Sequence, residues 1–313
     1  MEKGLNFEVL CSDGFRLSAT LFSSAKGEPN ERVAIINSGA GIPARYYQKF
    51  ALWLAARGIP TITYDYRGIG ESRPRTLRGF EASVEDWGSK DCAAVLRSIK
   101  GSFPQAHIAV IGHSIGGFVT GFVTDVGSID RLVFIGGHTG FYGDYRRSVR
   151  LQMFLTWHVL MPAVTQIVGY FPGRRFGLPA DLPMGVALEW AARIRPNFWW
   201  NIRRGGSPDF KRIDELRSRF AAFSAKGLLL RTRDDSFATA GSSARLAALF
   251  SNTEFSQDNL NPKKMGLGRV GHFGYFRSKC RNSIWPLIEN WVAIGQLDRS
   301  NLEGRLGPRA PVI

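Results

Sequence analysis

Cysteine is scarce in this chain of 313 residues, which holds only three, at positions 11, 92 and 280. The count is odd, the three lie far apart, and none has the C-x-x-C spacing or the nearby histidine of a zinc site. The sequence therefore predicts neither a disulfide framework nor a bound metal, and it favours a reducing cytoplasm as the compartment.

The N-terminus lacks the basic segment, apolar run and cleavage site of a secretory leader, so we expect no signal peptide. Charge is absent from one long run, because residues 151–173 contain no Asp, Glu, Lys or Arg and could cross a bilayer. A span would carry Gln152, His158, Pro162 and Gln166 into hydrocarbon. We expect a buried or pocket-lining helical segment instead of a membrane span, with peripheral membrane contact left open.

Acidic residues are too few to balance the basic ones, since 41 Lys and Arg against 26 Asp and Glu give a formal net charge of +15. An excess of this size favours contact with nucleic acid, anionic lipid or acidic substrates. The arginines occur in short scattered clusters, such as RRSVR and PGRRF, without a recognisable nucleic-acid module. We expect a solvated basic surface and no specific nucleic-acid partner.

Strand-like and helix-like segments alternate along much of the chain. A hairpin is expected around residues 12–14, between two β-prone runs. Alternating elements of these lengths predict an α/β protein with a mostly parallel central sheet flanked by helices. The later apolar runs lie at 32–39, 59–66, 107–114, 131–140 and 227–233, and the helical patterns at 46–58, 81–103, 116–126, 242–251 and 283–295.

The alternation stops between residues 141 and 218, where Trp, Pro and Arg become frequent and helical segments occur without a clear strand. We interpret this stretch, called the inserted segment below, as a helical cap or lid. It would precede the strand expected at 227–233 and lie over the sheet edge where ligands bind. Residues 1–140 and 219–300 would then form the core. Residues 301–313 are expected to form a flexible tail.

A serine surrounded by glycines follows one of the expected strands. Residues 112–116 form a G-x-S-x-G pattern between a β run and a helix. A sharp turn of this kind exposes the serine hydroxyl, and the glycines let neighbouring elements approach closely. The amide of Ile115, at the start of the helix, can stabilise negative charge on a substrate oxygen. Ser114 is therefore the candidate nucleophile, and the alternative is a glycine-rich turn without chemistry.

A catalytic serine needs a histidine to take its proton and a carboxylate to orient that histidine. Only His272 lies beyond the resumed sheet pattern, in a glycine-flanked stretch that suits a loop, so we predict it as the base. Asp234 and Asp235 end the preceding strand, and adjacent side chains there point in different directions. We predict Asp235 as the acid and a turn-capping or solvated role for Asp234. The histidines set aside are at 107, 113, 138 and 158.

The order Ser114, Asp235, His272 is similar to the order of nucleophile, acid and histidine in α/β-hydrolases. Residues 65–72, Asp-Tyr-Arg-Gly-Ile-Gly-Glu-Ser, resemble the D-x-R-G-x-G-x-S turn that many members carry, which is mainly structural. Over about residues 8–295 the chain resembles an α/β-hydrolase with a helical cap. Within that superfamily it is most similar to an uncharacterised bacterial group with a DYRGIG turn and a GHFG histidine loop.

The resemblance implies an oxyanion hole made by the Ile115 amide and an amide of the loop at 38–41, where the usual histidine is absent. By position the second donor is Ala40, and Gly39 is the alternative. The implied enzyme is a serine hydrolase that cleaves a carboxylic ester or related acyl bond, without metal or organic cofactor. Candidates for an apolar acyl pocket, with plain cap core as the alternative, are Trp157, His158, Trp190, Phe198, Trp199 and Trp200.

Two other functions stay open at this point. An acyltransferase would use the same residues but pass the acyl group to an acceptor other than water. A binding protein on the same fold would lack catalysis, and its expected mark is a broken catalytic constellation, whereas this one is complete. The expected partner in each case is a small molecule, and for the enzymes it is an apolar acyl substrate.

Overall fold

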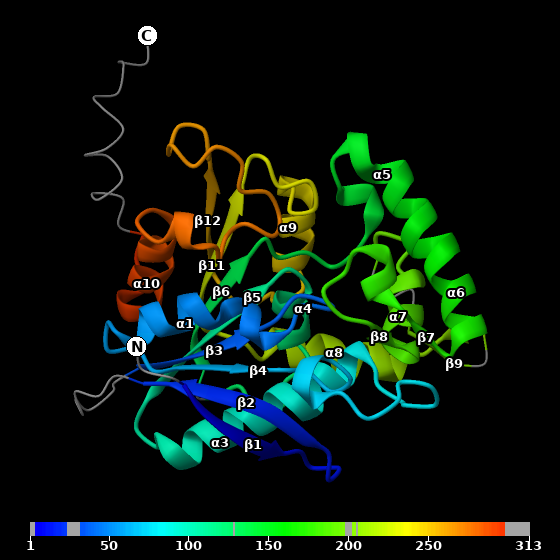
Figure 1. Cartoon of the computed structure of the whole chain (residues 1–313), viewed down its shortest axis with the longest axis horizontal. Coiled ribbons are helices and arrows are strands. Elements are labelled where there is room, and N and C mark those ends of the chain that lie inside the picture. The colour runs from blue at the N-terminus through cyan, green and yellow to red at the C-terminus, as the bar shows by residue number, and fades with distance from the viewer. Residues whose placement is uncertain (1–3, 24–31, 128, 198–201, 205, 298–313) are drawn as a thin grey trace.

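The computed structural model describes residues 4–23, 32–127, 129–197, 202–204 and 206–297. Its centre is an eight-stranded sheet in the order β1-β2-β4-β3-β5-β6-β11-β12 (Figure 1). Strand β2 pairs antiparallel with β1 and β4, and the other neighbours are parallel, so the predicted hairpin and mostly parallel sheet are confirmed. The strands are β1 (Leu5–Leu10), β2 (Arg16–Phe22), β3 (Arg32–Asn37), β4 (Thr61–Tyr64), β5 (His107–His113), β6 (Ile129–Ile135), β11 (Lys226–Thr232) and β12 (Phe255–Leu260).

Helices cover both faces of this sheet, as the unbroken apolar runs of its central strands require. Neighbouring residues of β3 enter different cores, with Ile35 on one face and Ile36 on the other. The Ile36 core includes residues of α1 (Gln48–Ala55) and α10 (Ile284–Ile294). The Ile35 core includes residues of α3 (Ala93–Ser102), α4 (Ile115–Thr120), α8 (Phe210–Ala221) and α9 (Ala240–Ala247).

Three elements outside the inserted segment differ from the sequence prediction. The edge strand β12 was not expected, because its sequence FSQDNL is largely polar; pairing only with β11, it buries just Asp258 and Leu260. The helix expected over 116–126 ends at Thr120. The helix expected over 81–103 consists of α2 (Val84–Asp86), a π-helical turn (Trp87–Cys92) and α3.

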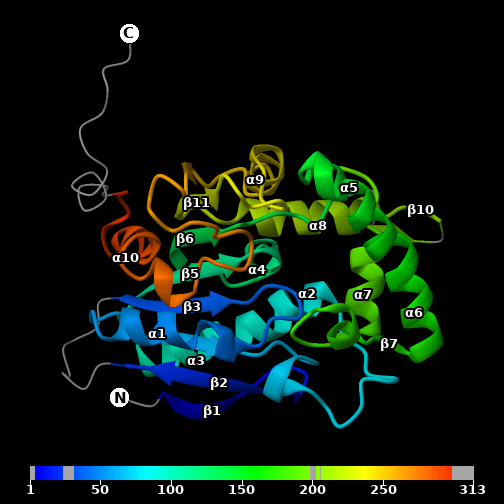
Figure 2. The ribbon, with the colours of Figure 1, turned by 45° about the horizontal axis from the view of Figure 1, so that its top comes forward.

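The inserted segment holds several helices that lie together on one side of the sheet (Figures 1 and 2). Strands were not expected there, but two short ladders are present, and the boundary expected after residue 218 falls within α8. Phe220 of α8 packs against Phe118 of α4, so the end of this helix joins the layer beside the sheet. The elements are α5 (Arg147–Phe154), η5 (Leu155–Leu160), α6 (Met161–Val168), β7 (Tyr170–Phe171), β8 (Leu182–Pro183), α7 (Met184–Ala191), β9 (Arg203–Arg204) and β10 (Ser207–Pro208).

α5, η5 and α6 form one helical run, Arg147–Val168, the only one in the described residues that is long and apolar enough to cross a membrane. The sequence predicted a buried or pocket-lining segment, and burial is wrong for most of it. Only 11% of its most apolar window is buried, because one side packs inward through Met161 and Thr165 while the other faces solvent.

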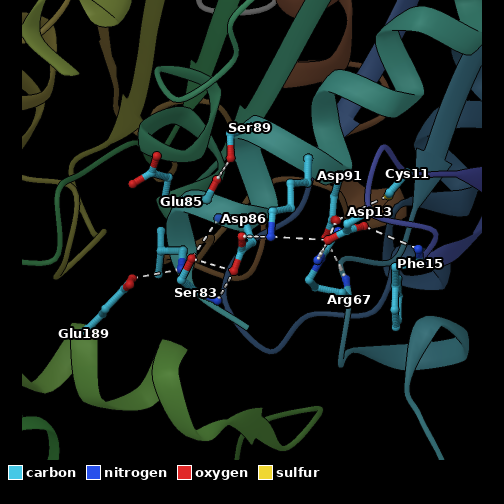
Figure 3. A network of polar contacts seen from close by, with 12 residues as sticks. Cys11, Asp13, Phe15, Arg67, Ser83, Glu85, Asp86, Ser89, Asp91 and Glu189 are labelled. Atoms are coloured by element: carbon cyan, nitrogen blue, oxygen red, sulfur yellow. Dashed lines mark hydrogen bonds and ion pairs between the residues drawn. The ribbon is translucent and has the colours of Figure 1, made fainter. Parts of the chain in front are cut away.

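The turn at residues 65–72 is tied into the core by a buried ion pair (Figure 3). Arg67 donates from Nε to Asp91 Oδ1 at 2.7 Å and from Nη1 to Asp13 Oδ2 at 2.7 Å. Cys11 donates its thiol proton to the same Asp91 carboxylate. These contacts join the opening hairpin, the turn and the helical region before α3. The role of Arg67 in this turn is therefore structural.

Candidate active site

Ser114 lies at the junction of β5 and α4 in a strained backbone conformation. Its φ of 57° and ψ of −122° make it the only non-glycine residue with positive φ in the described part of the chain. Such conformations cost free energy and concentrate at functional sites. The two flanking glycines permit the turn: a Cβ at Gly116 would lie 2.2 Å from the Asn37 carbonyl oxygen, and one at Gly112 would lie 2.5 Å from the Gly117 nitrogen.

The structure brings Ser114, Asp235 and His272 together in one hydrogen-bonded chain. His272 Nε2 lies 2.8 Å from Ser114 Oγ, and His272 Nδ1 lies 2.9 Å from Asp235 Oδ2. An ionised carboxylate only accepts hydrogen bonds, so Nδ1 carries the imidazole proton and Nε2 is free to accept the serine proton. All three side chains are buried.

The Asp235 carboxylate is held in its ionised form. Burial alone would raise its pKa, but the neighbouring His272 and several hydrogen-bond donors hold that pKa well below the usual range. Oδ1 accepts from the amides of Phe237 and Ala238 at 2.8 and 2.9 Å, and Oδ2 accepts from the Tyr275 hydroxyl at 2.8 Å. Asp234 points away and accepts from the Val270 and Gly271 amides, at 2.7 and 3.0 Å, in the loop that carries His272.

His113 bonds to a short helix and to the loop that carries His272, and no hydrogen bond joins it to Ser114 Oγ in the described residues. Because the His272 carbonyl can only accept, Nε2 carries the proton of the neutral His113 ring, and Nδ1 accepts from the Tyr47 hydroxyl at 2.8 Å. That hydroxyl also accepts from the Gly39 amide. His113 Nε2–H then donates to the His272 carbonyl at 3.0 Å. Burial, with the nearby His272, lowers the pKa of His113 to about 3, so the ring is neutral.

The amides expected to form the oxyanion hole are those of Ile115, which follows the serine in the chain, and Ala40. Ile115 is the first residue of α4, and Ala40 lines the pocket in front of Ser114. In the described residues, neither amide donates to a protein acceptor, whereas the alternative, Gly39, donates to Tyr47 at 3.0 Å. This engagement leaves Ala40 and Ile115 as the available pair of donors.

His138 is a site residue that the sequence analysis missed. It follows β6, and its Nε2 lies 3.1 Å from Ser114 Oγ. Because Nδ1 accepts from the Gly140 amide at 3.0 Å, Nε2 carries the proton and donates it to the serine oxygen. Burial, with the nearby His272, lowers the pKa of His138 well below its usual value, which keeps the ring neutral.

Its chain position before the inserted segment led us to set His138 aside. The available signal was its place just after the strand that follows β5, since the carboxyl ends of parallel neighbouring strands meet at one edge of the sheet. β6 does pair parallel with β5, which brings the two strand ends together.

An apolar pocket opens onto Ser114, His138 and His272. Trp157 and Trp190 line it as expected, but His158 does not. The His158 ring instead donates from Nδ1 to the Ala191 carbonyl at 2.7 Å and packs against Tyr142. Phe198, Trp199 and Trp200 lie outside the described residues. The other lining residues are Ala40, Ile42, Tyr145, Met161, Leu178, Leu182, Phe237 and Phe273.

Groups that could hold a metal ion are absent from the described residues, in which no three His, Cys, Asp or Glu side chains cluster suitably. The cysteines at 11, 92 and 280 are free and buried. The polar groups around Ser114 Oγ are the imidazoles of His272 and His138, and the Asp235 carboxylate bonds to His272 in turn.

Residues 28–158 match a family described as serine aminopeptidase, S33. The matched range includes Ser114 and His138 but ends before Asp235 and His272. No curated protein matches the chain significantly.

Solved structures resemble the chain over nearly its whole length. DcsB, in complex with its substrate analogue, is 15% identical with a TM-score of 0.62, covering 93% of this chain and 99% of its own. A malate-bound thermophilic esterase from Thermogutta terrifontis is 14% identical with a TM-score of 0.53, covering 92% and 98%. An esterase from Pyrococcus furiosus is 13% identical with a TM-score of 0.57, covering 93% and 91%. At such identities the likeness shows a shared fold.

Proposed function

Because this chain is an α/β-hydrolase in fold, we propose that it is a serine hydrolase that cleaves a carboxylic ester or related acyl bond through an acyl-enzyme on Ser114. The observation that carries the proposal is the chain of hydrogen bonds from Asp235 through His272 to a serine on a strained turn. The esterases among the structural neighbours support hydrolysis of an ester.

In the acylation half, Ser114 Oγ attacks the substrate carbonyl carbon while His272 Nε2 takes the hydroxyl proton. Asp235 holds the imidazole in the required tautomer and stabilises the imidazolium that forms. The carbonyl oxygen becomes an oxyanion that accepts hydrogen bonds from the Ala40 and Ile115 amides. The tetrahedral intermediate then collapses, the bond to the leaving group breaks, and the leaving group takes the proton from His272.

In the deacylation half, water attacks the acyl carbon and gives a proton to His272. Collapse of the second tetrahedral intermediate breaks the bond to Ser114 Oγ, which takes the proton back, and a carboxylic acid is released. Negative charge develops on Oγ as it leaves. The Nε2–H of His138 points at that oxygen and stabilises this charge.

The substrate class follows from the pocket. Its walls are mainly apolar, and Trp157, Met161, Leu178, Leu182 and Trp190 come from the inserted segment. We propose that this segment acts as the cap of the active site, with residues 1–140 and 219–300 as the core. An apolar acyl chain or aromatic acyl group fits such walls, because its burial there removes apolar surface from water.

The test is hydrolysis of p-nitrophenyl esters of increasing acyl length by the purified protein and by Ser114→Ala. We expect turnover to fall on the order of 10⁴-fold or more in the variant, while its far-ultraviolet circular dichroism spectrum stays unchanged. Added alcohols or thiols should not divert the acyl group, whereas an ester or thioester product would identify an acyltransferase. Equal turnover by Ser114→Ala would remove the proposal.

A further inference from the structure

The helical run Arg147–Val168 presents an apolar face to solvent. Exposed apolar side chains recur along it at intervals of four residues, with exposed fractions of 72% at Leu151, 50% at Leu155, 52% at Val159 and 81% at Ile167. Ala163, also exposed, completes the same register. These five residues are called the apolar stripe below.

The π-helical turn helps to keep the stripe on one side. In an α-helix of 3.6 residues per turn, each four-residue step drifts about 40° around the axis. η5 (Leu155–Leu160) has the wider i→i+5 turn, which offsets part of that drift in the middle of the run. The opposite side of the run is occupied, because Trp157 and Met161 line the Ser114 pocket.

Arginines stand at both ends of the stripe. Between Arg150 and Arg174 the chain carries no charged residue. Arg147 is exposed in the register of the stripe itself, and at the other end Arg78 donates from Nε to the Val168 carbonyl. The six end arginines are Arg146, Arg147 and Arg150 before the stripe, and Arg78, Arg174 and Arg175 beyond it. Figures 1 and 2 show the run along the outer edge of the molecule, away from α10.

An apolar stripe with cations at its ends matches the boundary between the hydrocarbon and the headgroups of an anionic lipid surface. A second copy of the chain matches less well. Each chain carries a net charge of +15, and in either orientation of two stripes arginines would meet arginines. A membrane span would remove Trp157 and Met161 from the pocket that they line.

We propose that the protein docks on an anionic lipid surface through the apolar stripe and the six end arginines. The stripe enters the headgroup region, and the arginines pair with lipid phosphates on either side. Docking stands apart from catalysis and needs no residue of the Ser114 site. One consequence rests on the proposed function: the helix whose inner side lines the acyl pocket then lies against the surface that holds apolar esters.

The test is sedimentation of the purified full chain with vesicles of phosphatidylcholine alone or mixed in equal parts with phosphatidylglycerol. We expect binding to the anionic vesicles, much weaker binding to the neutral ones, and loss in high salt. The stripe variant Leu155→Gln/Ile167→Gln and the charge variant Arg147→Gln/Arg175→Gln should each lower the partition coefficient on the order of tenfold.

Matched controls lie outside the run. Leu5→Gln/Leu10→Gln alters leucines of β1 that are 66% and 59% exposed, and Arg16→Gln/Arg281→Gln removes the same charge as the charge variant. The stripe control should bind like the unaltered protein, and the charge control should lose less binding than Arg147→Gln/Arg175→Gln. Two measurements separate the docking proposal from the proposed function. Ester turnover without lipid tests catalysis alone, and vesicle binding by Ser114→Ala tests docking alone.

Three results would overturn the docking proposal. They are absence of binding to anionic vesicles, equal losses in the test variants and their controls, and a dimer in analytical ultracentrifugation that Leu155→Gln/Ile167→Gln dissociates. The last result would assign the stripe to self-association. Unchanged circular dichroism of each variant establishes that it folds.

Discussion

At the scale of single residues, Ser114 Oγ is contacted by two imidazoles of opposite hydrogen-bonding sense. His272 accepts the serine proton through Nε2, whereas His138 donates to the serine oxygen. A donor on Oγ weakens it as a nucleophile and stabilises it as a leaving group. In the proposed mechanism His272 therefore assists both halves of the reaction, whereas His138 assists the release of the acyl group.

This division predicts the behaviour of His138 variants. His138→Ala should lower the deacylation rate on the order of tenfold, the value of one lost hydrogen bond, and should let the acyl-enzyme accumulate. His138→Gln keeps an N–H donor and should recover part of the rate. Intact-protein mass spectrometry during turnover measures the acylated fraction, and an unchanged fraction in His138→Ala would exclude this role.

The adjacent acids allow a matched comparison. Asp235→Asn removes the carboxylate that fixes the His272 tautomer, so kcat should fall on the order of 10⁴-fold. Asp234→Asn weakens only contacts with the Val270 and Gly271 amides, and its kcat should fall on the order of tenfold or less. Steady-state kinetics of both variants on one ester shows which aspartate orients His272. Equal losses of kcat would contradict the assignment of Asp235.

At the scale of elements, the serine turn depends on close approach of α4 to β3. Gly116→Ala would place a Cβ 2.2 Å from the Asn37 carbonyl oxygen, so the free energy of unfolding should fall by about 2 kcal/mol or more. Gly101→Ala in α3 meets no atom within 4 Å and should change stability by about 1 kcal/mol or less, in the stabilising direction. Urea unfolding of both variants measures this, and equal stability would refute the packing argument.

The same elements show what the sequence could predict. β3 and β5 are short apolar runs buried on both faces, so periodicity located them, and the glycine pattern located Ser114 between strand and helix. β12 escaped because an edge strand needs no apolar run. His138 escaped because its contact with Ser114 depends on which strands are neighbours, which no local pattern of residues states.

The inserted segment was predictable in composition but not in exposure. Apolar residues without charge at 151–173 indicated a helix, and Trp157 and Trp190 do line the pocket. The sequence could not show how much of the helical run is buried, because that depends on how the rest of the molecule packs against it. In the structure only one side of the run is covered. The exposed side became visible only when the tertiary packing of Met161 and Thr165 was known.

At the scale of the whole molecule, buried neutral histidines make stability depend on pH. Burial lowers the pKa of His113 from 6.5 to about 3, so in this window the unfolded chain binds a proton that the folded chain does not. The contribution of the neutral His113 to stability is fully present above pH 6.5, the pKa of the unfolded chain. It is lost as pH falls toward about 3, the pKa of the folded protein. The slope for one such histidine is about 1.4 kcal/mol per pH unit.

The prediction is that urea stability falls as pH drops below 6.5, and falls less steeply in His113→Gln. The comparison belongs in the upper part of the window, where the carboxylates of the unfolded chain remain ionised. His138, also buried with a lowered pKa, adds a contribution of the same sign to both proteins. Identical slopes in the two proteins would show that His113 is not neutral in the folded state.

The proposed function depends on an activated serine at position 114. Its most direct test is reaction of the purified protein with a fluorophosphonate probe, followed by peptide mass spectrometry, with Ser114→Ala and His272→Ala as controls. We predict labelling confined to Ser114 and lost in both variants. A folded protein that stays unlabelled, or that is labelled elsewhere, would contradict the account and favour a binding protein on the same fold.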